Sequence, residues 1–233
     1  MQTHKFFALP LVTAALIAAC GGGGGDAGTT PPPTGPTCTP AAAPPAGSTA
    51  PQVTVSISNG AGVSGTLVIT LEPTTTPVTV ANFLSYVNAG FYKGTVFHRH
   101  GRTNTQTTFV LQGGGYAAPV TSAARFPAPK PSNAPINLEV GRSLSNVCYS
   151  VAMARTTALN SATSEFFINT TDNVFLDTSD GGYAVFGNVT TGTALVNAMT
   201  TATCNFSSAN FALGSPDCVP EPNLIISSAT QTR

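Results

Sequence analysis

From about residue 52 onward, short apolar-rich runs alternate with turn residues, a pattern typical of β-strands. Between residues 53 and 57 every second side chain is apolar, so one face of that strand is expected to be buried. Leu67, Ile69 and Leu71 share a face in the same way after an Asn-Gly turn. We expect eight strands, at residues 53–57, 66–71, 95–100, 109–112, 150–155, 165–169, 184–189 and 223–229.

Two segments have helical spacing instead. Residues 80–87 carry apolar side chains at i, i+3, i+4 and i+7, and we expect Thr79 to cap this helix and the chain to leave it before Gly90. A second helix is expected at residues 194–199. The predicted fold class is therefore mainly β: an eight-stranded closed antiparallel β-barrel capped by two α-helices, formed by residues 52–233 as one domain.

The first nineteen residues predict a signal peptide. Residues 6–19 form an apolar run, interrupted by Pro10, that is short for a membrane span. Small residues stand directly before Cys20, which resembles the lipobox of bacterial lipoproteins, where the cysteine receives lipid and becomes the mature N-terminus. The alternative is an ordinary secretory signal that leaves Cys20 free.

Residues 20–51 predict a flexible linker, because a segment of Gly, Thr, Pro, Ala and Ser buries too little apolar surface to offset its ordering entropy. With a lipid on Cys20, this linker would hold the domain away from a membrane surface. We therefore expect a protein of the bacterial cell envelope with its domain in the periplasm. Gly21, next to the cysteine, resembles sorting to the outer membrane.

The charge content excludes two classes of partner. Only 8% of the 233 residues are charged and the formal net charge is zero. The chain therefore has no electrostatic footprint for nucleic acid and no polybasic segment for anionic lipid. We expect no nucleic-acid partner, and membrane attachment only through the N-terminal lipid.

Five cysteines fit this scheme, because lipidation of Cys20 leaves an even number for an oxidising compartment. Cys204 and Cys218 bracket a loop rich in Ser, Asn and Gly, so we pair them. By elimination, Cys38 pairs with Cys148 and ties the end of the linker to the domain. The alternative is a zinc site, which the absence of a C-x-x-C motif and the small number of histidines disfavour, and no metal is expected.

The candidate chemistry lies in Phe97-His98-Arg99 and in the run 109–115 on the next expected strand. This places one permanent cation, Arg99, and one amide, Gln112, among aromatic and aliphatic residues, with no carboxylate nearby in sequence. Hydrolysis needs a nucleophile and a base, which this pattern does not offer. The pattern favours holding an uncharged, ring-bearing peptide group while a hydrogen bond is donated to it.

The chain resembles the cyclophilin family of peptidyl-prolyl cis-trans isomerases over residues 53–230. Six segments carry the resemblance in the family's order: 80–84 with 90–92, 97–99, 112–115, 151–155 leading to 161–169, 175–177, and 182–187. The resemblance implies an enzyme that rotates Xaa-Pro peptide bonds in unfolded or flexible polypeptides. It implies no cofactor, and we expect a monomer.

The resemblance also assigns roles to single residues. Arg99 matches the catalytic arginine, and Gln112 matches the residue that hydrogen-bonds the substrate backbone next to proline. The residues expected to contact substrate are Phe109, Val110, Phe167 and Leu176 as the proline pocket, Phe175 where many eukaryotic members have Trp, Tyr183 at the rim, and Ala154 with Arg155 before the proline. His98 is expected to be structural, and His100 to reach the edge of the site on the face of Arg99.

Two departures from the family pattern stand beside the expected site. Residues 100–108 form a lengthened polar loop, which would alter substrate access or displace Phe109. Glu165 replaces a common Gln, and its carboxylate would pair with Arg99 or compete with substrate for it. The glycines at 113–115 are expected to serve strand bending and close packing.

Two alternatives to an isomerase stay open at this point. One is a non-catalytic peptide-binding or chaperone module that uses the same groove. The other is a barrel lipoprotein that binds a small apolar ligand, as lipocalins do. That second alternative requires an up-and-down strand order and an open barrel interior.

Overall fold

The computed structural model describes residues 38–42, 44–45, 47–121, 127–141, 143–206 and 217–233. The predicted signal peptide, the lipidation site Cys20 and the first part of the linker lie outside the described residues. Among the described residues, no helix has the length and apolar character needed to cross a membrane.

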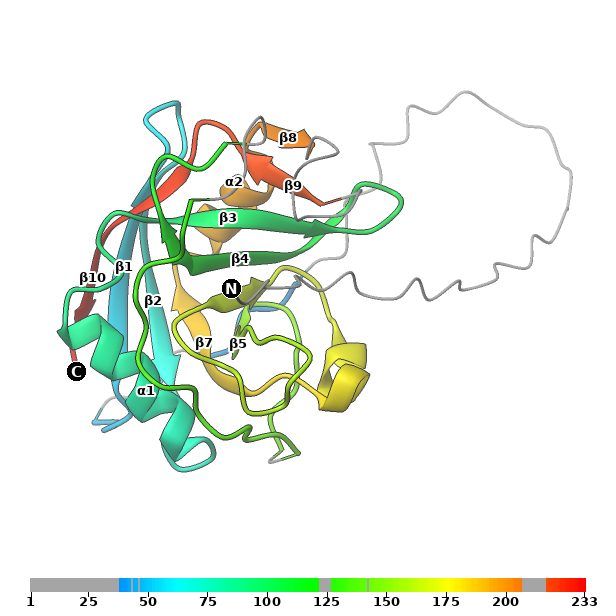
Figure 1. Ribbon diagram of the computed structural model, residues 1–233. Coiled ribbons are helices and arrows are strands. Elements are labelled where there is room, and N and C mark those ends of the chain that lie inside the picture. Colours follow the sequence, from blue (N-terminus) through cyan, green and yellow to red (C-terminus); the bar gives the residue numbers. More distant parts are fainter. Residues whose placement is uncertain (1–37, 43, 46, 122–126, 142, 207–216) are drawn as a thin grey trace, which may run out of the picture.

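Eight antiparallel strands close into a barrel, as the sequence predicted (Figure 1). Every neighbouring pair is antiparallel, and β10 pairs with both β1 and β3, which closes the sheet on itself. The order is not up-and-down, so the lipocalin-like alternative is wrong. Around the barrel the strands are β10 (Leu224–Gln231), β1 (Gln52–Ser58), β2 (Ser64–Leu71), β7 (Val185–Thr191), β5 (Ser150–Met153), β6 (Phe166–Asn169), β4 (Thr108–Ala117) and β3 (Thr95–Arg102).

A short hairpin outside the barrel was not predicted. Strands β8 (Cys204–Phe206) and β9 (Cys218–Pro220) pair with each other, and β9 pairs with β3 opposite His100. The sheet therefore continues for two strands beyond the closed barrel, on the outer edge of the strand that carries Arg99.

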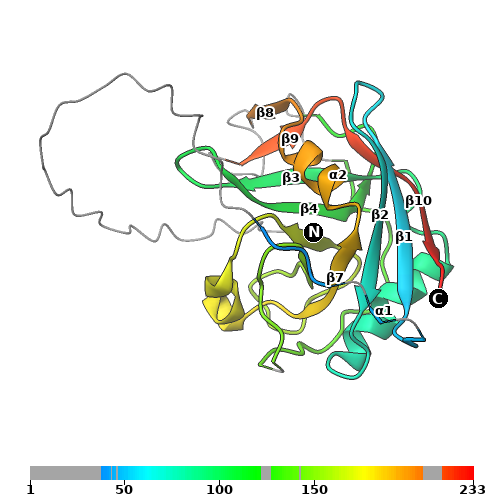
Figure 2. The same ribbon diagram turned by 180° about the vertical axis from the view of Figure 1, so that it is seen from behind.

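Two α-helices cover the ends of the barrel, α1 (Pro77–Asn88) and α2 (Thr193–Thr200) (Figures 1 and 2). The predicted cap of the first helix is wrong. Thr76 occupies the N-cap without a side-chain cap bond, and Thr79 lies buried in the first turn. Its backbone N–H and its hydroxyl both donate to Glu139 Oε2, each over 2.8 Å. A carboxylate from a distant loop thus satisfies the N-terminal N–H group that a cap normally serves.

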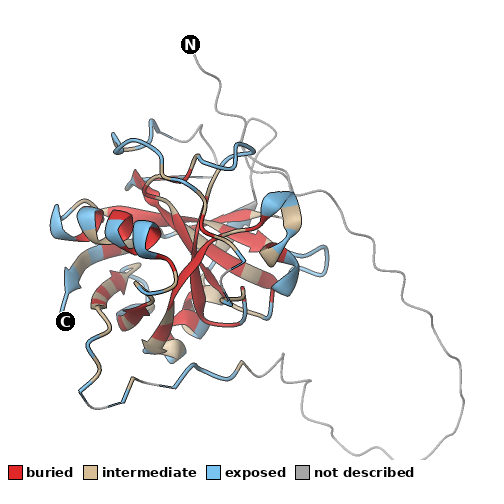
Figure 3. Ribbon diagram, turned by 90° about the horizontal axis from the view of Figure 1, so that it is seen from below, coloured by how far each residue is buried: buried red, intermediate tan, exposed pale blue. Residues whose placement is uncertain are grey.

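Side chains fill the barrel interior, and most residues of the barrel strands are buried (Figure 3). Phe83 of α1 packs its ring centroid 5.6 Å from Phe166 and 5.0 Å from Phe186. All three side chains are 0–1% exposed. Aliphatic residues of the strands and of α2 belong to the same cluster, so the interior is a packed core.

Both disulfide bonds expected from the sequence are present, Cys38–Cys148 and Cys204–Cys218. The first ties the segment before β1 to the start of β5, across 110 residues of sequence. The second joins β8 to β9 within the added hairpin.

The glycines of β4 are required by close packing, as predicted. A Cβ at Gly113 would stand 2.8 Å from the carbonyl oxygen of Val96. Gly114 has a φ of +90°, and a Cβ there would stand 3.0 Å from the carbonyl oxygen of Ser164. Neither position accepts a side chain without moving the backbone of a neighbouring segment.

Candidate active site

Arg99 and Gln112 lie directly opposite each other on β3 and β4. Arg99 Nη1 donates a hydrogen bond of 2.8 Å to Gln112 Oε1. The arginine side chain is 17% exposed, so its guanidinium is largely fixed by protein contacts yet accessible to a ligand. The structure therefore brings together the two residues that the sequence singled out.

Asp217 is the second partner of Arg99, and the sequence analysis missed it. Arg99 Nε donates to Asp217 Oδ2 over 2.6 Å, and the backbone N–H of Arg102 donates to Asp217 Oδ1 over 2.9 Å. Within the described part of the chain, Arg99 Nη2 has no hydrogen-bond partner. Two contacts thus fix the plane of the guanidinium and leave one of its terminal nitrogens available.

Glu165 acts on Arg99 through Gln112 and not by direct pairing, which corrects the expectation from the sequence. Gln112 Nε2 donates to Glu165 Oε2 over 2.8 Å, and His98 Nε2 lies 3.5 Å from the same oxygen. Burial would raise the pKa of Glu165, but His98, the Gln112 hydrogen bond and the charge of Arg99 outweigh it, so this pKa is lowered. The carboxylate stays ionised and orients the amide of Gln112.

A second apolar cluster, separate from the barrel core, lies beside this polar pair. It consists of the buried residues Val110, Ala152, Ala154, Phe167, Leu176 and Val185, with Phe109, Leu144 and Tyr183 packed against it. Phe167 stands opposite Gln112 in the β4–β6 register, so an aromatic ring and the amide side chain occupy neighbouring positions. Six of the eight residues expected to contact substrate meet in this cluster, and the other two, Phe175 and Arg155, border it.

Phe175 lies on the 3-10 helix η1 (Val174–Asp177) at the border of the second apolar cluster. It is 43% exposed, and its ring centroid is 6.1 Å from that of Phe109. Asp177 anchors this helix, because its Oδ1 accepts hydrogen bonds of 2.8 Å from the backbone N–H and from Nδ2 of Asn146. An exposed aromatic side chain is thus held at the rim of the cluster on a tethered support.

Arg155 does not present a free guanidinium to the cluster. Its Nε donates to the carbonyl oxygen of Gly182 over 3.0 Å, and its guanidinium carbon lies 4.6 Å from the ring centroid of Tyr183. Tyr183 in turn packs against Phe167, with ring centroids 5.7 Å apart. Arg155 therefore fixes the rim residue Tyr183.

The lengthened segment 100–108 extends the β3–β4 hairpin instead of forming an open loop (Figure 1). Arg102 pairs with Thr108, and the backbone N–H of Thr103 donates to the carbonyl oxygen of Thr107 over 2.9 Å. Phe109 keeps its place beside the second apolar cluster. Of the two effects expected of this segment, the displacement of Phe109 is therefore wrong, and altered substrate access stays a prediction.

His100 does not reach the edge of the site, which corrects the sequence-based expectation. It is fully buried, its two ring nitrogens have no hydrogen-bond partner in the described part of the chain, and its neighbours are the sulfurs of Cys204 and Cys218, within 4.8 Å. Burial, with a smaller effect from the charge of Arg102, lowers its pKa to about 3. A zinc ion at this place would need these three side chains as ligands, but the two sulfurs are bonded to each other and offer no thiolate.

A closed antiparallel barrel with an arginine–glutamine pair beside a separate apolar cluster defines a class of protein, the cyclophilins. The model of the cyclophilin type peptidyl-prolyl cis-trans isomerase family matches residues 53–230. The chain belongs to this family.

Three relatives illustrate the match. Peptidyl-prolyl cis-trans isomerase A of Dickeya dadantii is 42% identical over 131 residues, which cover 55% of this chain and 63% of that protein. The isomerase cyp18 of Streptomyces antibioticus is 43% identical over 141 residues, covering 58% of this chain and 78% of that protein. Peptidyl-prolyl cis-trans isomerase B of Escherichia coli is 36% identical over 171 residues, covering 71% and 93%. The match thus spans a little under two thirds of the Dickeya protein and nearly all of the Escherichia coli protein.

Solved structures share the fold. A cyclophilin type isomerase of Cryptosporidium parvum is similar with a TM-score of 0.58 and 20% identity, over 79% of this chain and 98% of that chain. The structure of that protein in the presence of the dipeptide Ala-Pro gives a TM-score of 0.57, also with 20% identity, over 78% of this chain and 99% of that chain. At this identity the likeness concerns the fold alone.

Proposed function

We propose that this chain accelerates cis-trans rotation of Xaa-Pro peptide bonds, and that Arg99 does so by stabilising the twisted peptide group. One observation carries the proposal: Asp217 and Gln112 hold the guanidinium beside the second apolar cluster while Nη2 keeps no partner in the described residues. Membership of the cyclophilin family supports the reaction.

The difficulty of this reaction lies in the partial double bond of the peptide group. The barrier is about 20 kcal/mol, so uncatalysed rotation takes on the order of tens of seconds or longer. As the bond twists, the lone pair of the prolyl nitrogen no longer delocalises into the carbonyl group and becomes a hydrogen-bond acceptor. A donor aimed at this nitrogen binds the twisted state better than either planar isomer, which is the requirement for acceleration.

The residues of the site divide this task between them. Arg99 stays charged at any working pH and donates without a proton transfer. Gln112 uses one hydrogen of its Nε2 for Glu165, so the second hydrogen remains for a carbonyl oxygen of the substrate backbone. The side chains of Phe109, Phe167 and Leu176 offer apolar contact for the proline ring.

The competing function is a peptide-binding or chaperone module that uses the same surface without catalysis. The test is NMR exchange spectroscopy on a short Xaa-Pro peptide with the purified protein. We expect the cis-trans interconversion rate to rise in proportion to the concentration of added protein. Peptide resonances that shift on binding while the interconversion rate stays at its uncatalysed value would favour the non-catalytic module.

We also propose that the protein is a lipid-anchored component of the bacterial cell envelope that acts on proline-containing proteins in the periplasm. Two disulfide bonds support an oxidising compartment, and Cys20 after an apolar run supports lipidation. In cells fed a labelled fatty acid, the wild-type protein should carry the label and sediment with membranes, and Cys20→Ser should do neither. Equal labelling and sedimentation of both proteins would refute the anchor.

A further inference from the structure

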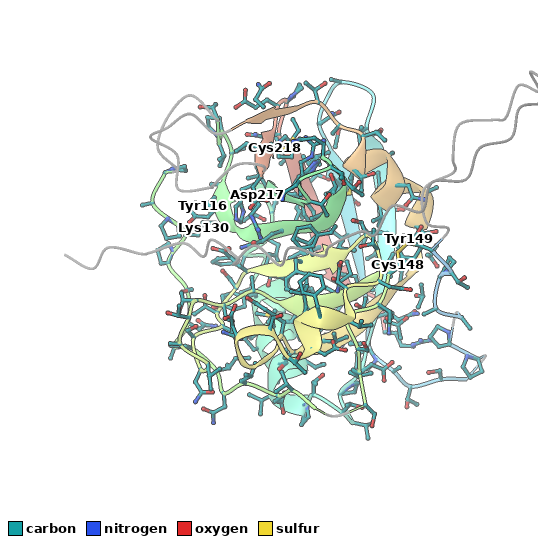
Figure 4. All side chains as sticks on the ribbon, turned by 90° about the vertical axis from the view of Figure 1, so that its right-hand side faces the viewer. Tyr116, Lys130, Cys148, Tyr149, Asp217 and Cys218 are labelled. Carbon is teal, nitrogen blue, oxygen red and sulfur yellow. A yellow bond between two sulfur atoms is a disulfide. The ribbon has the colours of Figure 1, made fainter. Side chains whose placement is uncertain are left out.

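The hairpin formed by β8 and β9 is the part of the sheet that the barrel itself does not need. The eight barrel strands close without it, through the pairing of β10 with β3. The hairpin lies on the outer edge of β3. Asp217, the residue just before Cys218 and β9 (Figure 4), contacts Arg99 of β3. The hairpin therefore supplies a carboxylate partner to Arg99 that the barrel strands do not supply.

Both carboxylate oxygens of Asp217 are engaged by β3. Oδ2 accepts from Arg99 Nε over 2.6 Å, and Oδ1 accepts from the backbone N–H of Arg102 over 2.9 Å. The side chains of Arg99 and Asp217 are only 17% and 13% exposed, so water competes weakly for this contact. Because the carboxylate is tied to the backbone of the same strand, it acts as a fixed reference for the guanidinium.

The two partners of Arg99 have complementary effects. Asp217 accepts a hydrogen bond from Nε and Gln112 accepts one from Nη1, so the two residues together set the plane of the guanidinium. An arginine side chain has several rotatable bonds, and fixing it before substrate arrives removes that freedom from the reaction step. The remaining terminal nitrogen, Nη2, then has a defined direction.

The Cys204–Cys218 disulfide lies directly beside Asp217 in the chain. Strands β8 and β9 have three residues each, too few to form a stable hairpin through backbone pairing alone. The disulfide joins them covalently, and Cys218 is the residue directly after Asp217. After reduction β9 would have no disulfide link to β8. It would keep its pairing with β3 at His100–Cys218, the packing of Val219 in a cluster that includes Val96 of β3, and the contacts of Asp217.

We propose that Asp217 is a positioning residue for Arg99, and that the Cys204–Cys218 disulfide keeps it in place so that isomerase activity depends on the oxidised hairpin. The inference rests on the role proposed for Arg99. Reduction by a dithiol breaks the S–S bond: two electrons and two protons pass to the cysteines, and the reductant becomes a cyclic disulfide.

The first test is Asp217→Asn, which keeps the shape of the side chain and removes its charge. We expect kcat/KM for an Xaa-Pro peptide to fall about tenfold, through kcat, with KM changed less than about twofold. The conservative variant Asp217→Glu should recover part of the loss. The ¹⁵Nε–¹H NMR signal of Arg99 should shift and exchange faster with water in Asp217→Asn, which reports the weakened contact with Asp217. A fall in kcat with little change in KM is the result that a merely structural role of Asp217 would not cause.

The second test compares the two disulfides. The double variant Cys204→Ala/Cys218→Ala should lower kcat/KM about as much as Asp217→Asn, and combining it with Asp217→Asn should add little. The matched control is Cys38→Ala/Cys148→Ala, whose disulfide lies outside the hairpin of β8 and β9 and should leave kcat/KM unchanged. Circular dichroism and peptide affinity confirm that each variant is folded.

Three outcomes would overturn the proposal. Unchanged kcat/KM in folded Asp217→Asn would show that Arg99 needs no such partner. Increased kcat/KM would show that Asp217 restrains the arginine. Equal losses in the two disulfide variants would show that the effect is general destabilisation. Failure of the role of Arg99 itself is recognised separately, because Arg99→Ala would then keep wild-type activity.

Discussion

Arg99→Ala is expected to lower kcat/KM for an Xaa-Pro peptide by about 10²- to 10³-fold, the size of effect seen when one donor to a transition state is removed. The variant loses the only group in the proposed mechanism that interacts with the prolyl nitrogen. Peptide binding should change far less, because the second apolar cluster and Gln112 remain. A protease-coupled assay measures the rate, and NMR titration measures peptide binding.

The control for this variant is Arg233→Ala. Arg233 lies at the C-terminal end, where its Nε donates to the carbonyl oxygen of Ala50, remote in the chain from the β3–β4 pair. Its removal takes away an equal charge and should leave kcat/KM unchanged. If Arg99→Ala keeps more than about half of the wild-type rate, the guanidinium is not the catalytic group.

Gly114→Ala is expected to destabilise the fold by about 2–5 kcal/mol, the second large effect we anticipate. The alanine would have to adopt a backbone φ of +90°. Its Cβ would stand 2.9 Å from the ring of Tyr92 and 3.0 Å from the carbonyl oxygen of Ser164. Both neighbours are buried. Denaturant unfolding monitored by fluorescence or circular dichroism gives the change in the free energy of unfolding.

Gly90→Ala separates the two causes of that loss. Gly90 has a φ of +65°, but a Cβ there would meet no atom within 4 Å. Its substitution should therefore cost only the backbone strain, about 1–2 kcal/mol. Equal losses in the two variants would mean that close packing around Gly114 contributes nothing.

The barrel could be predicted from sequence because alternation of apolar and polar residues is a local property of each strand. The N-terminus of α1 could not, because the group that satisfies Thr79 is Glu139, 60 residues further along the chain. The hairpin of β8 and β9 was missed for a related reason. Three-residue strands carry too few side chains for a periodic pattern.

In the site, too, residues in local motifs could be predicted and contacts between distant segments could not. Arg99, Gln112 and the apolar residues lie in segments that resemble family motifs, so their meeting could be expected. Asp217 belongs to no such segment and reaches Arg99 across 118 residues. The only sequence signal near it was the pairing of Cys218 with Cys204, which located the loop but not the carboxylate. His100 was misplaced because adjacent residues on a strand face opposite sides, so it turns from Arg99 toward the disulfide.

The position of Glu165 near Arg99 was predicted correctly, but its contact was not. The sequence indicated a carboxylate near Arg99. In the structure the side chain of Gln112 lies between the two residues and hydrogen-bonds both Arg99 and Glu165. An extended amide side chain spans the gap, and this depends on the β3–β4–β6 register that no local pattern reveals.

A crystal structure of the protein with a bound Xaa-Pro peptide would test the central claim most directly. The decisive quantity is the distance from Arg99 Nη2 to the prolyl nitrogen. We expect about 3–3.5 Å, with the proline ring against Phe167 and Leu176 and with Asp217 still on Nε. A proline ring bound elsewhere, or a guanidinium turned away from the peptide nitrogen, would contradict the account.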